Sequence, residues 1–301
     1  MSANIYRELA DLKGFSLKNC PPMMEPSGVL MCPPDHFQVL SVKNPYMSAH
    51  VGGVDVEKAR RQWRDLVAAF EKAGCPVETI APTPGLEDMV FAANSSLAGT
   101  RPDGEKVALI SSMRHASRRK ETAAFEEWYE ARGYRVQRLK PGGHETFEGS
   151  GDAVWHPGKR LLWGGHGFRT DPAMFEQVAE VFKTPVIMLK LVNERFYHLD
   201  TCFCPLTPEA VLIYPSAFDA GSLELILKIF PIVVTSSEAD AVQRMSCNAA
   251  VWRSKTAIVQ KGAAAAIGHM KALGLDAVEV DTSEFVKSGG SVYCMKQYLF
   301  G

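Results

Sequence analysis

The spacing of apolar residues along the chain changes repeatedly between a helical and a strand-like pattern. In residues 56–73 apolar side chains recur on one helical face, so we predict a helix there that ends at Gly74. Short runs rich in valine, isoleucine and leucine predict strands between such helices. Further helices are expected at 118–131, 172–182, 222–229 and 263–273. Strands are expected at 37–43, 77–80, 90–93, 107–110, 135–139, 153–155, 161–163, 186–189, 201–205, 211–214, 232–235, 249–252, 257–260 and 277–280, and in the segment that carries Cys294.

These elements repeat in the order strand pair, helix, strand, in units of about 45 to 60 residues. A repeated unit whose copies share a core predicts a single α/β array rather than two separate domains. Residues 1–34 contain Pro21-Pro22 and Pro33-Pro34 and show no periodic pattern, so we expect an N-terminal extension there. Residues 35–301 are expected to form one domain.

Charge and composition argue against several classes of protein. The 301 residues contain 33 Lys and Arg against 34 Asp and Glu, so binding to nucleic acid or a membrane surface through bulk charge is not expected. The sequence contains no run of about 18 apolar residues that would predict a transmembrane helix. The first residues lack a signal-peptide pattern, so we expect a cytoplasmic protein. The basic cluster at 118–120 is expected to be a solvated face.

The seven cysteines, in a chain with no export signal, are expected to be reduced. Cys202 and Cys204 form the one close pair. The sequence offers no second pair and no paired histidines at ligand spacing, so this pair is a poor zinc site. We therefore expect both thiols to pack inside the protein, and we expect no metal.

Five short polar stretches lie at predicted strand ends or in loops, where catalytic groups usually collect. Each has an ordinary structural explanation. Asparagine is a common turn residue, paired carboxylates can satisfy their own loop, and most free cysteines are small buried hydrophobes. A lone His-x-Asp pair on one face of a strand lacks the further ligands of a metal site. The stretches are Lys43–Pro45, Phe91–Ser96, Phe147–Asp152, His198–Asp200 and Ser283–Cys294.

Together the five stretches form a chemically coherent set. The thiolate of Cys294 would be a nucleophile, and His198 can deprotonate the thiol or carry protons to a leaving amine. The additional carboxylates predict a cationic substrate, because a planar guanidinium group binds carboxylates through paired hydrogen bonds. Carboxylates that hold this group flat would present its carbon to the approaching thiolate.

Four motifs in this order resemble the guanidine-group-modifying enzymes. They are Phe147-Glu-Gly-Ser-Gly-Asp152, Gly167-Phe-Arg-Thr170, His198-Leu-Asp-Thr201 and Gly289-Gly-Ser-Val-Tyr-Cys294. That superfamily contains arginine deiminases, dimethylarginine dimethylaminohydrolases, arginine dihydrolases and glycine amidinotransferases. The resemblance runs from about residue 37 to residue 294. It implies the pentein fold, a five-bladed α/β-propeller of repeated ββαβ modules with pseudo-fivefold symmetry, and catalysis without a metal or organic cofactor.

The resemblance also implies roles for individual residues. Cys294 would be the nucleophile and His198 the general acid and base. Glu148 would hold the guanidinium nitrogens, with Asp200 as a second partner. Arg169 and Arg114 match arginines that grip the α-carboxylate of the substrate, although a plain surface charge explains Arg114 equally well.

Two departures from the family pattern bear on the reaction. Asn94 stands where deiminases and dimethylaminohydrolases have aspartate, whereas arginine dihydrolases have asparagine there and at the position of Asn44. The segment from Glu148 to Asp152 is one residue longer than the Glu-x-Gly-Asp of several relatives.

The first departure favours an arginine dihydrolase. Three alternatives stay open: a deiminase or dimethylaminohydrolase that yields citrulline, an amidinotransferase, and a non-catalytic pentein that only binds its ligand. The expected partner is a small molecule, arginine or a methylated arginine, and self-association into a homo-oligomer stays open.

Overall fold

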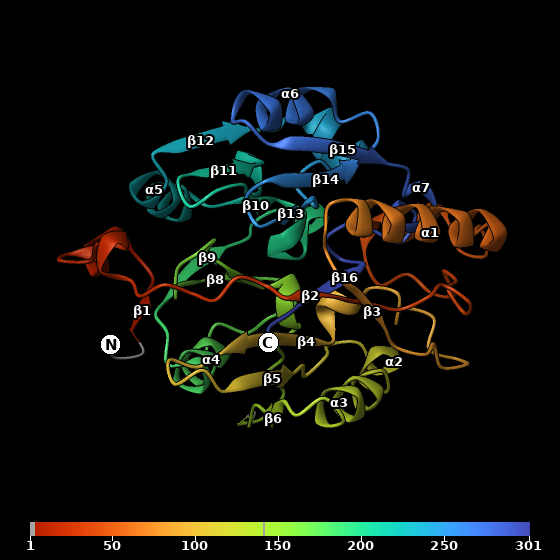
Figure 1. Cartoon of the computed structure of the whole chain (residues 1–301), viewed down its shortest axis with the longest axis horizontal. Helices are drawn as coiled ribbons and strands as arrows, with labels where there is room; N and C mark the ends of the chain where they lie inside the picture. Colours follow the sequence, from red (N-terminus) through yellow and green to blue (C-terminus); the bar gives the residue numbers. More distant parts are fainter. Residues whose placement is uncertain (1–3, 141) are drawn as a thin grey trace.

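The structure is a computed structural model that describes residues 4–140 and 142–301. Figure 1 shows a mixed α/β fold in which the longer helices lie around the outside of several small sheets. Residues 1–3 of the expected N-terminal extension lie outside the described residues. Within the described chain, no helix is both long enough and apolar enough to cross a membrane.

The strands of the described residues form five separate sheets, and none of these closes on itself. In each sheet an antiparallel pair is extended by a third strand that runs parallel to its neighbour. The sheets are β16-β2-β3, β4-β5-β6, β7-β8-β9, β10-β11-β12 and β13-β14-β15, with the short β1 paired to β9. Because β16 pairs with β2, the end of the chain completes the first sheet.

The strands have the following bounds: β1 Ile5–Tyr6, β2 Gly28–Met31, β3 Val77–Thr79, β4 Ser96–Thr100, β5 Lys106–Ile110, β6 Arg135–Arg138, β7 Ala153–Trp155, β8 Leu162–His166, β9 Val186–Lys190, β10 Phe203–Pro205, β11 Ala210–Ile213, β12 Ile232–Thr235, β13 Ala250–Trp252, β14 Thr256–Gln260, β15 Asp276–Val280 and β16 Lys296–Leu299. The helices are α1 Val56–Lys72, α2 Ala116–Arg119, α3 Thr122–Glu130, α4 Met174–Phe182, α5 Ala220–Ile229, α6 Ala264–Ala272 and α7 Ser283–Val286.

One of the longer helices connects the second and third strands of every sheet: α1, α3, α4, α5 and α6. This order confirms the predicted strand pair, helix, strand unit and the α/β class. In α1, the Asp55 side chain accepts the backbone N–H of Lys58 at 2.9 Å, a cap that contributes about 1 kcal/mol. Leu66 and Phe70 on one face are fully buried, and Gly74 follows the last turn in a left-handed conformation.

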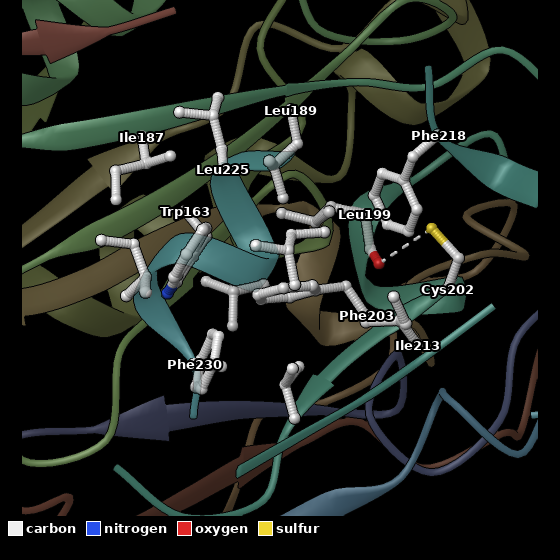
Figure 2. Packing of buried hydrophobic residues seen from close by; sticks show 14 of the residues in the cluster. Trp163, Ile187, Leu189, Leu199, Cys202, Phe203, Ile213, Phe218, Leu225 and Phe230 are labelled. Atoms are coloured by element: carbon white, nitrogen blue, oxygen red, sulfur yellow. Dashed lines mark hydrogen bonds between the residues drawn. The ribbon is translucent and has the colours of Figure 1, made fainter. Parts of the chain in front are cut away.

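A hydrophobic cluster between two of the sheets anchors a turn of the candidate site (Figure 2). Trp163 of β8 packs on Phe203 of β10 and on Phe230, with ring centroids about 5 Å apart. Leu199 is buried in the same cluster, and the Cys202 thiol lies 3.5 Å from the Leu199 carbonyl oxygen. Burial of each large side chain contributes about 1.5–3 kcal/mol, so the turn around Leu199 is held firmly.

The cysteines are buried as expected. Cys202 and Cys204 both pack inside, in two different hydrophobic clusters, and all seven cysteines are free.

The expected strand at 37–43 is wrong, and the true strand β2 lies earlier, inside the segment expected to be irregular. Phe37 and Val39 are buried while Leu40 and Val42 are exposed, so a loop lying over the core imitates the alternation of a strand. All four residues of β2 are buried between β3 and β16. Part of the expected extension therefore belongs to a sheet, and a domain boundary at residue 35 would separate β2 from its partners β3 and β16.

Three further expectations need correction. Residues 92–94 form a 3₁₀ turn rather than a strand, and β4 begins only at Ser96. The helix expected at 118–131 is divided into α2 and α3. Cys294 lies in a turn two residues before β16 rather than within a strand.

Candidate active site

Most of the predicted site residues meet in one pocket of about 320 Å³. Four predicted site residues, three of which line the pocket, each lie in the turn that leads into the first strand of a module: Asn94 before β4, Glu148 before β7, His198 before β10 and Cys294 before β16. The repeated module thus delivers one polar side chain after another to the same end of the sheets. The pocket is lined by Lys43, Asn44, Met47, Asp88, Phe91, Asn94, Arg118, Arg169, Tyr197, His198, Ser288, Gly290 and Cys294.

Glu148 is completely buried and holds the centre of a charged network. Its Oε2 lies 2.6 Å from Nε2 of His198 and 3.0 Å from Nη1 of Arg169, and its Oε1 accepts the backbone N–H of Arg114 at 3.0 Å. Burial alone would raise the pKa of Glu148, but Arg169 and the hydrogen bond with His198 hold it well below its usual range. Glu148 is therefore a carboxylate at neutral pH.

His198 is neutral at the same pH. Burial lowers its pKa to about 4, against the raising effect of Glu148. Nδ2 of Asn94 approaches Nδ1 of His198 at 3.5 Å. An amide N–H directed at Nδ1 makes that nitrogen an acceptor, so the proton resides on Nε2 and is donated to Glu148.

Cys294 is paired with Asp200 rather than with the histidine. Its thiol donates to Oδ2 of Asp200 at 3.2 Å. Burial raises the pKa of Asp200 to about 7, and burial together with the Asp200 charge raises the pKa of Cys294 well above its usual value. At neutral pH and without substrate the sulfur is therefore a thiol.

The expectation that His198 and Asp200 share one face of a strand is wrong. Residues 199–201 form a 3₁₀ turn, and the two side chains leave it toward different partners, Glu148 and Cys294. Oδ1 of Asp152 accepts the backbone N–H of Leu199 at 3.0 Å and so stabilises this turn. The turn thereby places the His198 imidazole in the pocket lining and the Asp200 carboxylate against the Cys294 thiol.

The longer segment from Glu148 to Asp152 forms a tight 3₁₀ turn against Asn94. A Cβ atom on Gly151 would lie 2.4 Å from Nδ2 of Asn94, so the absence of a side chain there allows the close approach. The extra residue is accommodated in this turn, and Glu148 still enters the network of His198 and Arg169.

The two asparagines differ in their surroundings. Asn94 accepts from Nη1 of Arg118 at 2.9 Å and turns its amide nitrogen toward His198. Asn44 donates to the Ser288 carbonyl oxygen at 2.9 Å and caps the turn that follows it by accepting the N–H of Tyr46. Asn44 therefore ties the loop that precedes α1 to the segment that leads to Cys294.

The two arginines also differ. Arg169 is buried, lies 4.6 Å from the ring centre of Tyr197 and donates to the Lys43 carbonyl oxygen as well as to Glu148. The Arg114 side chain is exposed, donates to the Phe168 carbonyl oxygen and is absent from the lining of the pocket. Binding of a carboxylate by Arg114 stays a prediction.

Sequence reasoning missed Arg118, which was expected on a solvated face. Only 5% of it is exposed, and it forms an ion pair of 3.0 Å with Glu121 while donating to Asn94. Arg119 and Lys120 are exposed as expected. The spacing of Arg118 and Glu121, three apart at a helix start, was the available signal for a pair.

Asp88 was also missed, and Lys43, which begins one of the five polar stretches, was given no role of its own. Lys43 lies 2.6 Å from carboxylate oxygens of both Glu87 and Asp88, and all three side chains are largely buried. Oδ1 of Asp88 is buried without a hydrogen-bond partner among the described residues. Within those residues, no group of three His, Cys, Asp or Glu side chains is placed to hold a metal ion.

A protein family, individual related sequences and solved structures all relate this chain to the same family. Residues 41–300 match the family described as N,N dimethylarginine dimethylhydrolase, eukaryotic. The bifunctional arginine dihydrolase/ornithine cyclodeaminase ArgZ of Synechocystis is 38% identical over 271 residues, which are 89% of this chain and 37% of ArgZ. The N(G),N(G)-dimethylarginine dimethylaminohydrolase of Mycobacterium tuberculosis is 34% identical over 264 residues, 88% of this chain and 83% of that protein.

Among solved structures, the N-terminal domain of an asparagine-to-serine variant of ArgZ, covalently bound to a reaction intermediate, superposes with a TM-score of 0.84 at 34% identity. The match covers 90% of this chain and 97% of that domain. The chain belongs to the dimethylarginine dimethylaminohydrolase family of the pentein superfamily and is a hydrolase of guanidino C–N bonds.

Proposed function

We propose that this protein is an arginine dihydrolase, which converts arginine to ornithine, ammonia and carbon dioxide through a covalent adduct on Cys294. One observation carries the proposal. The Cys294 thiol, the neutral imidazole of His198 and the Asn94 amide line one pocket, and the ionised Glu148 is hydrogen-bonded to the imidazole from outside the pocket lining. The same set of groups suits a nucleophile, a proton carrier and a guanidinium anchor.

The pocket supports binding of a zwitterionic amino acid with a cationic side chain. Glu148 and Asp200 would hold the guanidinium, and Oδ1 of Asp200 has no hydrogen-bond partner among the described residues. Arg169, and the exposed Arg114 if it turns toward the substrate, would bind the α-carboxylate. Asp88 lines the pocket, and its Oδ1, which has no hydrogen-bond partner in the described part of the chain, suits the α-ammonium group.

The first half of the reaction forms a bond between Sγ of Cys294 and the guanidinium carbon. An arriving cation beside Asp200 lowers the thiol pKa, and the thiol proton passes to the neutral His198, which leaves a thiolate as the nucleophile. The C–N bond then breaks, and ammonia leaves with a proton supplied through His198. Water attacks the thiouronium carbon, gives its proton to His198 and breaks the S–C bond, which leaves a ureido group.

The second half would repeat the attack on the bound ureido group. A second ammonia leaves, a second water releases Cys294, and the resulting carbamate loses carbon dioxide to give ornithine. Asn94 is neutral and can both donate and accept hydrogen bonds, so it suits retention of the neutral ureido intermediate. Relatives named as arginine dihydrolases support this version.

The family match supports a second candidate, a dimethylaminohydrolase that releases dimethylamine and stops at citrulline. Amino-acid analysis of products from arginine, citrulline and dimethylarginine separates the two. Ornithine from arginine without free citrulline is the expected result. Citrulline as the only product would assign the protein to the deiminases, and dimethylamine from dimethylarginine to the dimethylaminohydrolases.

We propose, finally, that the five sheets are the blades of a pentein propeller and that they form a single catalytic domain. The five equivalent modules and the common place of four site residues support this arrangement. The domain would start at or before Gly28, because β2 belongs to its first sheet. A cytoplasmic location and assembly into homo-oligomers stay predictions.

A further inference from the structure

Four modules place a predicted site residue in the turn before their first strand, and the remaining module places Asn248 there. Asn248 lies two residues before β13, just as Cys294 lies two residues before β16. It is fully buried. No motif of the sequence singles this asparagine out, but the repeat of the fold assigns it a place at the same end of the sheets.

The side chain of Asn248 uses its whole hydrogen-bonding capacity on the nucleophile and its surroundings. Oδ1 accepts the backbone N–H groups of Ser291 at 2.9 Å and of Cys294 at 3.2 Å. Nδ2 donates to Sγ of Cys294 at 3.1 Å and to the Asp200 carbonyl oxygen at 2.9 Å. Two acceptor contacts and two donor contacts leave nothing unused.

These contacts also fix which way the amide points. An oxygen must face the two backbone N–H groups of Ser291 and Cys294, because a nitrogen there would oppose donor with donor. The amide nitrogen is therefore directed at the sulfur. A thiolate can only accept hydrogen bonds, so it gains more from this N–H than a neutral thiol does.

We infer that Asn248 is a catalytic residue whose amide holds the turn of Cys294 in place and donates the hydrogen bond that stabilises the thiolate. The inference rests on the proposed role of Cys294 as nucleophile. The effect of Asn248 on the sulfur is opposite to that of Asp200, whose carboxylate disfavours negative charge there. The charged and titratable groups around the sulfur, besides Asp200, are Tyr197, Tyr293 and Lys296, the first residue of β16.

The test is the pH dependence of Cys294 alkylation by iodoacetamide, measured on the full chain by mass spectrometry of the Cys294 peptide. Two variants are compared with the wild type. Asn248→Asp keeps an oxygen for both backbone N–H groups but loses the donor, and Asn248→Leu loses the donor without adding charge. Both variants are expected to raise the pH midpoint of Cys294 alkylation by about one unit. At a given pH below the midpoint, the thiolate fraction would then be about tenfold smaller than in the wild type.

Asn193→Asp is the matched control, because Asn193 also accepts a backbone N–H but in an exposed turn. Its midpoint should equal that of the wild type. If Asn248→Leu does not fold, Asn248→Ala removes the same donor. An unchanged midpoint in the neutral variant, or a rise confined to Asn248→Asp, overturns the inference. The readout needs no turnover, so it can fail or succeed independently of arginine hydrolysis by Cys294.

Discussion

Nε2 of His198 lies 2.6 Å from Oε2 of Glu148, while no hydrogen bond joins His198 to Cys294 among the described residues. The imidazole and the thiol both line the pocket, and each is hydrogen-bonded to its own carboxylate. A substrate carbon would lie between them. This arrangement suits a histidine that handles leaving group and water, and a thiol that is activated by the arriving cation.

The buried neutral state of His198 predicts a pH-dependent contribution to stability. Its pKa is about 4 in the folded protein against 6.5 in the unfolded chain, so the unfolded chain binds more protons between these values. The contribution is therefore complete above pH 6.5 and is lost as the pH falls toward 4, by up to about 3 kcal/mol.

Denaturant unfolding of wild type and His198→Gln at several pH values measures this contribution. The difference between the two should shrink as the pH falls from 6.5 to 4. Other groups that titrate in this window, Asp200 among them, are present in both proteins and largely cancel. His144 is exposed, so the free energy of unfolding of His144→Gln should change with pH as that of the wild type does. Parallel curves for wild type and His198→Gln would refute the buried neutral imidazole.

Asp200→Asn should make Cys294 more reactive but the enzyme less effective. The carboxylate raises the thiol pKa by its charge and by accepting the thiol hydrogen. Its removal should speed iodoacetamide alkylation at pH 7 roughly tenfold, for a shift of about one unit. KM for arginine should rise because a guanidinium partner is lost. Asp219→Asn, which keeps its capping oxygen at α5, is the control. Slower alkylation of Asp200→Asn would contradict the account.

Gly290→Ala should impair both stability and turnover. A Cβ atom there would lie 2.4 Å from Cε1 of Phe91 and 3.2 Å from Cβ of Cys294, so the turn that carries the nucleophile must shift. Overpacking of this kind costs about 1–3 kcal/mol. Gly268→Ala in α6 meets nothing within 4 Å and should instead stabilise the helix by about 0.5–1 kcal/mol. Equal effects in thermal unfolding would count against the predicted clash.

The repeated module was predictable because local signals set it. Helical spacing, a cap such as Asp55 and a stop such as Gly74 depend on neighbours within a few residues. The strand β2 was missed because its partners, β3 and β16, lie far along the chain. The loop at 37–43 imitated a strand because its buried side chains, Phe37 among them, alternate with exposed ones.

The candidate site was predictable where a motif carried it and not where burial did. Glu148, His198 and Cys294 belong to short motifs, and the structure brings them to one place. Arg118 looked like a surface charge because one of its partners, Asn94, is 24 residues away. Asn248 belongs to no motif, and only the position of its turn in the fold indicates a role.

Whether Cys294 is the nucleophile is tested by the rate of arginine consumption by the wild type and by Cys294→Ala, with Cys202→Ala as a buried-cysteine control. Circular dichroism checks that each variant is folded, and mass spectrometry of acid-quenched wild type detects an adduct on the Cys294 peptide. Cys294→Ala should show no turnover and no adduct, and Cys202→Ala should stay active. Consumption of arginine at the wild-type rate by folded Cys294→Ala would contradict the role of Cys294 as the nucleophile.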